Sequence, residues 1–192
     1  MKRIAEIASV SSGYHFRGGV NHVADGRYAV IQAKDVDDSF HFDRERLVRV
    51  NLEADPERYL VRQGDVVFLS RGLRPWALSI AEPIGHTVVP SSFYILRADP
   101  QRVRPEYLAW FLNHPKTQAR LGDIAKGSNI PFISMREFGD FPVQIPSLEI
   151  QEKIIDLARL CDREQRLLRE VATLRSQLVD AVCFDLAQDK GA

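Results

Sequence analysis

Neither proline nor glycine occurs between Pro146 and Gly191, and this unbroken run constrains the chain more than any other feature. Proline and glycine are the residues that most disfavour a helix interior, so the run predicts one long helix that opens after Pro146. A helix of about forty residues spans about 60 Å. The preceding region is too small to cover a rod of that length, so we expect a good part of the helix to meet a partner.

The expected helix carries a wide apolar stripe. In heptad notation apolar residues recur at positions a, d and e, which describes a helix with neighbours on more than one side. Glu164 interrupts the a positions; it either fixes the register of a helix pair or faces water where the helices splay apart. A helix folded back on its own domain is the alternative to dimerisation. The candidate dimerisation contacts are Leu157, Leu160, Leu167, Val171, Leu174 and Leu178.

Composition sets broad limits on the class of protein. Hydrophobic residues make up 45% of the sequence, which is ordinary for a globular core. The formal net charge is zero, with 26 basic and 26 acidic residues. This balance gives no support to a generally basic, nonspecific nucleic-acid binder, but it allows a locally basic face.

Cellular location is inferred from the cysteines and from hydropathy. Cys161 and Cys183 would lie about 33 Å apart along one helix, beyond the reach of an intramolecular disulfide; a bridge between chains stays open. The start, Met1–Glu6, is too charged for a signal peptide, and no apolar stretch approaches the roughly 20 residues of a membrane span. We expect a soluble cytoplasmic protein without a membrane partner.

The region before the long helix reads as short strands. Helices sized to connect parallel strands are missing between them, so we expect a mixed or antiparallel, strongly curved sheet. The apolar runs that predict strands, each bounded by turn residues, are Tyr28–Ile31, Leu47–Val50, Val66–Leu69, Leu78–Ala81 and Phe93–Leu96.

Three shorter helices are expected around these strands. Apolar residues at helical spacing predict one within Met1–Val10, and Pro105 opens a second that runs to Leu112. Ser134 and Glu137 fit a capping box for a third, before a final strand at Phe141–Ile145. The predicted fold class is therefore α+β: a domain over residues 1–145 with a curved mixed or antiparallel sheet, followed by a helix over residues 146–190 that forms a coiled coil.

Several segments resemble one protein family in their order along the chain. Phe141–Ile155 resembles the junction between target-recognition domain and conserved helix in specificity subunits of type I restriction–modification systems. Leu60–Gly72 looks like that family's strand entering a Ser-Arg-Gly loop, and Gly127–Ile133 looks like its Gly-Ser segment. Val30–Val36 and Pro105–Asn113 also have equivalents. The ordered set of motifs is what carries the resemblance.

The resemblance implies a function and a set of partners. Family members usually hold two recognition domains and two long helices, whereas this chain has one of each. A homodimer, or pairing with another half-subunit, would then read two half-sites of double-stranded DNA. The implied protein partners are methyltransferase (M) subunits, with a restriction (R) subunit left open. The M subunits would bind S-adenosylmethionine, and this chain would need no cofactor.

Catalytic motifs are missing from the sequence. It has neither the glycine-rich loop and Asn/Asp-Pro-Pro-Tyr/Phe motif of an amino-methyltransferase nor a P-loop. Asp25 with Gln32–Lys34 is poorly spaced for a paired-carboxylate nuclease, and the histidines lack metal-ligand spacing. We expect a non-catalytic subunit without a metal site. The alternatives are a standalone nuclease and a coiled-coil decoy or regulatory half-subunit that binds the methyltransferase without reading DNA.

Candidate DNA contacts are loop residues with forked or cationic donors. Arg71 and Arg74 follow a strand, and their guanidinium groups suit guanine edges or phosphates. Gln32 ends another strand and offers an amide that bonds adenine through two hydrogen bonds. Tyr14–Gly19 joins aromatic, basic and flexible residues. The candidate set is Arg17, Gln32, Lys34, Ser70, Arg71, Arg74, Lys126, Ser128 and Asn129.

Each candidate also has an ordinary structural interpretation. Arg71 could pair with an internal carboxylate, Gln32 and Lys34 could be solvated at a strand end, and Lys126–Asn129 could form a plain turn. Three further residues, Trp76, Ser91 and Ser92, are weaker candidates, because Trp76 suits the core and the serines suit a buried strand edge.

Overall fold

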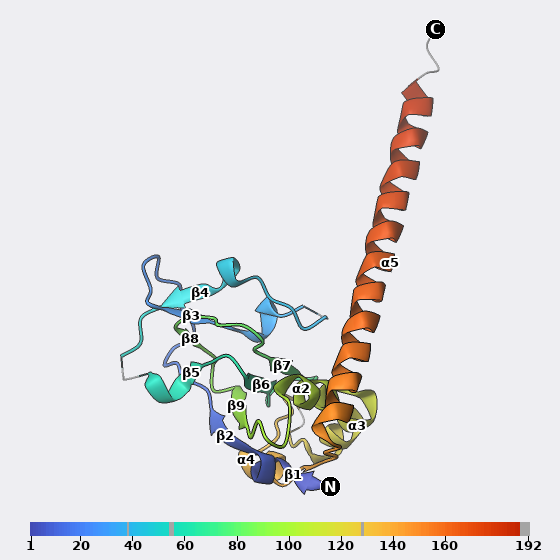
Figure 1. Ribbon diagram of the computed structural model, residues 1–192. Coiled ribbons are helices and arrows are strands. Elements are labelled where there is room, and N and C mark those ends of the chain that lie inside the picture. The colour runs from blue at the N-terminus through green and yellow to red at the C-terminus, as the bar shows by residue number, and fades with distance from the viewer. Residues whose placement is uncertain (38, 54–55, 128, 189–192) are drawn as a thin grey trace. The chain divides into compact units, whose positions relative to one another are not determined.

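The computed structural model describes residues 1–37, 39–53, 56–127 and 129–188. By its internal contacts the chain divides into one unit over Met1–Ile155 and a second that begins at Asp156. Within the described residues the first unit contains two four-stranded sheets, a two-stranded sheet and short helices (Figure 1). The second unit is the greater part of one long helix. The predicted α+β class, with antiparallel strands and a long C-terminal helix, is confirmed.

The first sheet is antiparallel and has the order β2-β9-β6-β7. Its strands are β2 (Ala8–Ser12), β9 (Phe93–Ala98), β6 (Asp65–Leu69) and β7 (Ala77–Ser79). Strand β6 lies inside the sheet and is buried along its whole length. Successive side chains of a strand point to opposite faces, so Val66 and Phe68 enter a core under the helices while Val67 and Leu69 enter a core between the two sheets.

The second sheet has the order β4-β3-β8-β5. Its strands are β4 (Val48–Val50), β3 (Tyr28–Val30), β8 (Thr87–Val88) and β5 (Leu60–Val61). Strands β3 and β8 are parallel, and the other neighbours are antiparallel. The second sheet packs on one side of the first, and the short helices lie on the other (Figure 1).

The helices on the far side of the first sheet are α1 (Ile4–Ile7), α2 (Pro105–Asn113), α3 (Pro115–Ile124) and α4 (Met135–Gly139). Phe138 of α4 stacks on Phe68 of β6 at 4.1 Å between ring centroids, which joins helix layer and sheet. The predicted helix at Pro105 and the cap at Ser134 are present: Ser134 Oγ accepts a hydrogen bond from the backbone N–H of Glu137. A two-stranded sheet pairs β1 (Lys2–Arg3) with β10 (Pro142–Val143).

The prediction of a helix over Met1–Val10 is wrong beyond its first turn. Only Ile4–Ile7 is helical, and Ala8–Ser12 pairs along its length with β9. Ile4 and Ile7 are buried one turn apart, which accounts for the helical spacing. The residues that follow include Val10 and three serines, which are poor helix formers, and β9 supplies their backbone with partners.

The long helix α5 (Leu148–Gln188) is unbroken, as the sequence predicted. Its start is held within the first unit by Gln151, which is fully buried. Gln151 Oε1 accepts a hydrogen bond from the backbone N–H of Arg104 at 2.8 Å, and its Nε2 donates to the carbonyls of Arg102 and Pro146. Arg104 also pairs with Glu152 at 2.7 Å.

The stripe of α5 is exposed in the single chain. Each of the six candidate dimerisation residues keeps at least 52% of its surface exposed. None of the helices in the described part of the chain is long and apolar enough to cross a membrane.

Candidate nucleic-acid interface

All four strands of the first sheet have one terminus along the same edge of the sheet, the edge that runs across the strands. β2 ends beside the start of β9, since Ser12 pairs with Tyr94, and β6 ends there too, since Leu69 pairs with Phe93. β7 begins opposite Phe68. The segments that leave β2 and β6, and the one that enters β9, therefore meet at this edge.

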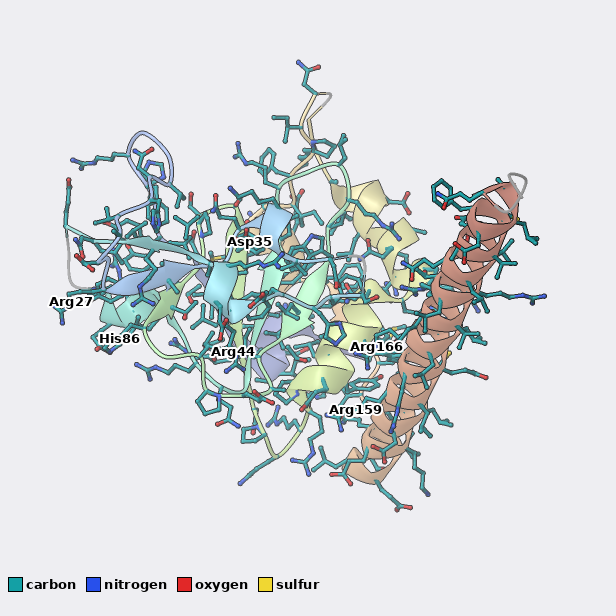
Figure 2. All side chains as sticks on the ribbon, turned by 90° about the horizontal axis from the view of Figure 1, so that it is seen from above. Arg27, Asp35, Arg44, His86, Arg159 and Arg166 are labelled. Carbon is teal, nitrogen blue, oxygen red and sulfur yellow. The ribbon has the colours of Figure 1, made fainter. Side chains whose placement is uncertain are left out.

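The second sheet presents its strand ends at the same edge. Parallel β3 and β8 both end here, with Val30 opposite Val88, and β5 begins here with Leu60 opposite Val88. The link Val89–Ser92 runs directly from the end of β8 to the start of β9 and so joins the two sheets. In Figure 2, Arg27 and His86, which precede β3 and β8, lie at one side, and Asp35, which follows β3, lies away from them.

Backbone hydrogen bonds tie the neighbouring loops to this link. Tyr14 donates to the carbonyl of Val89 at 2.8 Å, and Ser70 donates to the carbonyl of Ser92 at 2.9 Å. Ile31, just after β3, donates to the carbonyl of Val88. We call the surface formed by residues 13–17, 31–35, 57–59, 70–76 and 89–92 the shared edge.

A further loop from the helix layer joins the shared edge. Lys126 and Phe132 exchange two backbone hydrogen bonds, and Gly72 donates to the carbonyl of Pro131 at 3.0 Å. Arg71 forms a bridge with Phe132 and places its guanidinium over that ring, 5.4 Å from the centroid. Loop 126–132 therefore lies beside loop 70–76, and the structure brings two separately predicted sets of residues together.

The predicted cations are exposed at or beside this edge. Arg17, Lys34, Arg71, Arg74 and Lys126 all have exposed side chains, and so does Asn129. Guanidinium and ammonium groups at loop tips are the donors that contact phosphates and base edges. Ser128, the remaining predicted residue of loop 126–132, lies outside the described residues.

Two predicted residues do not face outward. Ser70 is buried, and its hydroxyl donates to the carbonyl of Ser92 at 2.9 Å, so it joins two loops. The side-chain nitrogen of Gln32 is also buried and has no hydrogen-bond partner among the described residues. The backbone N–H of Gln32 donates to Asp35 Oδ2, which closes the turn η1 (Ala33–Asp35) and exposes Lys34.

Trp76 packs against other aromatic rings, which is the structural role that was expected as the alternative to a DNA contact. Its ring packs edge-on against Phe93 at 5.4 Å and lies 6.4 Å from Phe40, between centroids. Trp76 and Arg74 also line a hollow together with Ala33 and Val36, so the loops after β3 and β6 are neighbours.

An ion pair steadies loop 126–132. Lys126 Nζ lies 2.5 Å from Glu137 Oε1, and Ser134 Oγ donates to Glu137 Oε2 at 2.7 Å. The bonds from Lys126 and from Ser134 lower the pKa of Glu137 below its usual value. The carboxylate stays ionised at neutral pH and holds the base of the loop against α4.

Sequence reasoning missed several residues of the shared edge. Arg58 and Tyr59 belong to the turn η3 (Glu57–Tyr59), which precedes a strand of only two residues, so no apolar run marked their place. Arg58 stacks over the Tyr59 ring at 4.5 Å. Leu73, between the two arginines of its loop, is 89% exposed. The position of Leu73 between Arg71 and Arg74 was a usable signal in the sequence.

Metal chemistry finds no support among the residues that the structure describes. No group of three or more His, Cys, Asp or Glu side chains there is arranged to hold a metal ion. The loops of this surface carry cationic tips and are held by two four-stranded sheets.

The sequence itself assigns the family. Residues 1–170 match the family described as the type I restriction modification DNA specificity domain. The chain belongs to this family, as its motifs indicated. No curated protein sequence matches it.

Solved structures share the fold at low sequence identity. An S subunit of a type I restriction–modification system from M. genitalium matches with a TM-score of 0.60 and 12% identity over 99% of this chain and 46% of that chain. A chain from a study of complex assembly and conformational transition of the type I R-M system has a TM-score of 0.65 and 14% identity, covering 94% and 42%. The HsdS subunit from Thermoanaerobacter tengcongensis has a TM-score of 0.55 and 15% identity, covering 85% and 37%. This chain spans less than half the length of each.

Proposed function

We propose that the chain recognises a DNA sequence on behalf of a type I restriction–modification complex. The observation that carries the proposal is the convergence of separate cationic loops on the shared edge. Each chain reads one half-site of double-stranded DNA, and the M subunits that it recruits perform the methylation. The chain itself is non-catalytic, and an R subunit is an optional further partner of the assembled complex.

The loop tips divide the reading task by their chemistry. Arg71, Arg74 and Arg17 offer forked donors that suit guanine edges and phosphates, and Lys34 and Lys126 suit phosphates. Asn129 offers an amide that suits adenine. Ser70 and Gln32 act through the backbone of their loops, because their side chains face inward.

The second part of the proposal is that the chain dimerises through the long helix α5. Its six apolar candidates (Leu157, Leu160, Leu167, Val171, Leu174 and Leu178) are exposed in the single chain and recur along one stripe. Covering this stripe with a second copy removes that surface from water, which favours association. The proposed division of labour is recognition by residues 1–145 and dimerisation by residues 146–190. A homodimer reads the same half-site twice in inverted orientation; pairing with a different half-subunit gives an asymmetric site.

The test is a binding selection with the chain and its M subunits produced together. Random duplexes retained by the complex are sequenced, and the proposal expects a bipartite motif with two short half-sites at a fixed spacing. A salt titration of binding then counts phosphate contacts, because affinity falls steeply with salt when several phosphates are neutralised. Recovery of random sequence alone refutes sequence recognition.

A decoy or regulatory half-subunit is the second candidate. The exposed stripe of α5 and the formal net charge of zero favour it, because a pure interaction module needs the stripe and not a basic face. Such a chain would bind the M subunits but would not itself bind DNA. The salt titration would then show no DNA binding that falls as the salt concentration rises. The same titration therefore separates the two candidates.

A further inference from the structure

A hollow opens beside the shared edge, on the outer face of the second sheet. Its volume is about 590 Å³, within the range of small-ligand pockets. One part of its wall is apolar and aromatic, formed by Tyr14, Phe16, Tyr59, Val50 and Leu52. The other part is polar, formed by His15, Arg17, Asn21, Asn51 and Glu53. We call this hollow the aromatic pocket.

Three rings of the wall hold one another in place. Tyr14 meets Phe16 edge-on at 4.8 Å and meets Tyr59 edge-on at 5.2 Å, between ring centroids. All three rings are only half-buried in the free chain. Aromatic rings fixed beside a nucleic-acid-binding surface are platforms on which bases stack.

The segment that forms the wall is anchored at both ends. Gly13 approaches the link so closely that a Cβ would lie 2.3 Å from the carbonyl oxygen of Pro90, and Gly26 is equally close to β4, 2.4 Å from the N atom of Val50. Gly18 and Gly19 turn the chain between these anchors with φ values of 82° and 92°. His15 Nδ1 lies 3.5 Å from Ser91 Oγ, so the wall is continuous with the shared edge.

The polar groups match one kind of ligand. A carboxylate such as that of Glu53 accepts a hydrogen bond from an exocyclic amino group and disfavours an anion beside it. Asn51 Oδ1 already accepts from the backbone N–H of Arg27, which leaves its amide N–H as a donor for a ring nitrogen. The cation of Arg17 suits a phosphate. These preferences fit a nucleotide whose neutral base lies inside the aromatic pocket and whose phosphate lies outside it, beside Arg17.

We propose that the aromatic pocket binds a nucleobase with an exocyclic amino group, such as adenine, once that base has left the duplex stack. The ring system stacks on Phe16 and Tyr59, the amino group donates to Glu53, and the phosphate meets Arg17. The proposal rests on the proposed DNA recognition, because the shared edge delivers the strand to the pocket. Extrusion of a base breaks its pairing and stacking in the duplex, and stacking in the pocket offsets this cost in part.

The test compares two duplexes that differ by one unpaired adenine, at low salt and with the full chain. Stacking of 1–2 kcal/mol predicts that the duplex with the unpaired adenine binds roughly 5- to 30-fold more tightly. With 2-aminopurine at that position, binding quenches the fluorescence of the probe. Phe16→Leu and Tyr59→Leu remove both effects while keeping apolar side chains. Glu53→Gln weakens the preference for unpaired adenine over unpaired thymine.

The control is Tyr28→Leu, which removes a half-buried ring that packs on the same hydrophobic cluster as the pocket wall but does not line the pocket. Its preference for the unpaired adenine stays at the wild-type level. Equal binding of the two duplexes overturns the pocket and leaves DNA recognition standing. If neither duplex binds, a titration with 2-aminopurine deoxyribonucleoside monophosphate tests whether the pocket binds a free nucleotide. Quenching that Tyr59→Leu abolishes keeps the pocket and rejects DNA recognition; no quenching rejects both.

Discussion

The guanidinium of Arg71 lies over the ring of Phe132, and the two residues also pair through their backbones. The contact holds a loop from the sheet against a loop from the helix layer, 61 residues further along the chain. Because the pair sits where the two loops meet, its loss affects both the direct donor and the position of the neighbouring loop.

Replacing Arg71 by alanine should therefore weaken specific DNA binding. A forked contact to a base or phosphate contributes about 1–3 kcal/mol, so we expect an affinity roughly 5- to 150-fold lower. Fluorescence anisotropy with the selected duplex measures the change. Arg27→Ala is the matched control, since Arg27 is an exposed arginine that precedes β3 at the opposite side of the sheet. Equal losses in the two variants contradict the assigned interface.

Charges placed in the stripe of α5 should separate the proposed dimer. The double variant Leu167→Asp and Leu174→Asp puts two carboxylates where the proposed interface buries apolar side chains, which is costly without partners. Light scattering should report a dimer for the parent and a monomer for the variant. Arg169→Asp with Ser176→Asp, at f positions opposite the stripe, should leave the dimer intact. A monomeric parent rejects the dimerisation proposal.

The buried amide of Gln151 should be necessary for full stability. Gln151→Leu keeps similar volume but leaves the N–H of Arg104 and the carbonyls of Arg102 and Pro146 without this partner. A fully buried group left unsatisfied costs roughly 1–3 kcal/mol. Because Arg102 is exposed and Arg104 and Pro146 are only partly buried, water replaces part of the loss, and the free energy of unfolding should fall by about 2–4 kcal/mol in total. Thermal and urea unfolding measure it. Gln165→Leu, on the exposed part of the same helix, should change stability by less than about 0.5 kcal/mol.

The Lys126–Glu137 pair should give stability a defined pH dependence. Its bonds lower the folded-state pKa of Glu137 below the ordinary value of 4.5. The ionised carboxylate therefore stabilises the fold fully above about pH 4.5, and this contribution is lost as the pH falls through the lower folded pKa. Urea unfolding of the parent and of Glu137→Gln should differ near neutral pH and converge in acid. A difference that stays constant with pH refutes the assignment.

Long local signals made part of this structure predictable. The run after Pro146 and the proline at the start of α2 define helices by neighbouring residues alone, and five strands carry apolar runs. Strands β5 and β8 have two residues each and are held by pairing with distant segments, so no local pattern marks them. The Met1–Val10 prediction failed for the same reason: β9 imposes the strand that the local spacing did not show.

The candidate site was predictable in its residue types but not in its assembly. Exposed arginines and lysines in loops were identified from the sequence. Whether a side chain points outward depends on partners elsewhere in the chain: Ser92 turns Ser70 inward, and surrounding packing buries the amide nitrogen of Gln32. Tyr59 reaches Tyr14 only because β5 pairs with β8 and the link Val89–Ser92 brings Tyr14 to the end of β8.

That four-residue link also bears on how new specificities arise. Loop 70–76 runs between buried Leu69 of β6 and buried Ala77 of β7, and the link runs between buried Val88 and buried Phe93, so an exchanged loop 70–76 keeps anchor points that the sheet already holds. Residues that would set the target preference can thus change without disturbing the residues that hold the fold. To redirect the protein to other DNA sequences, a library should randomise residues 71–74 and 129–130 and keep Val89–Ser92 intact.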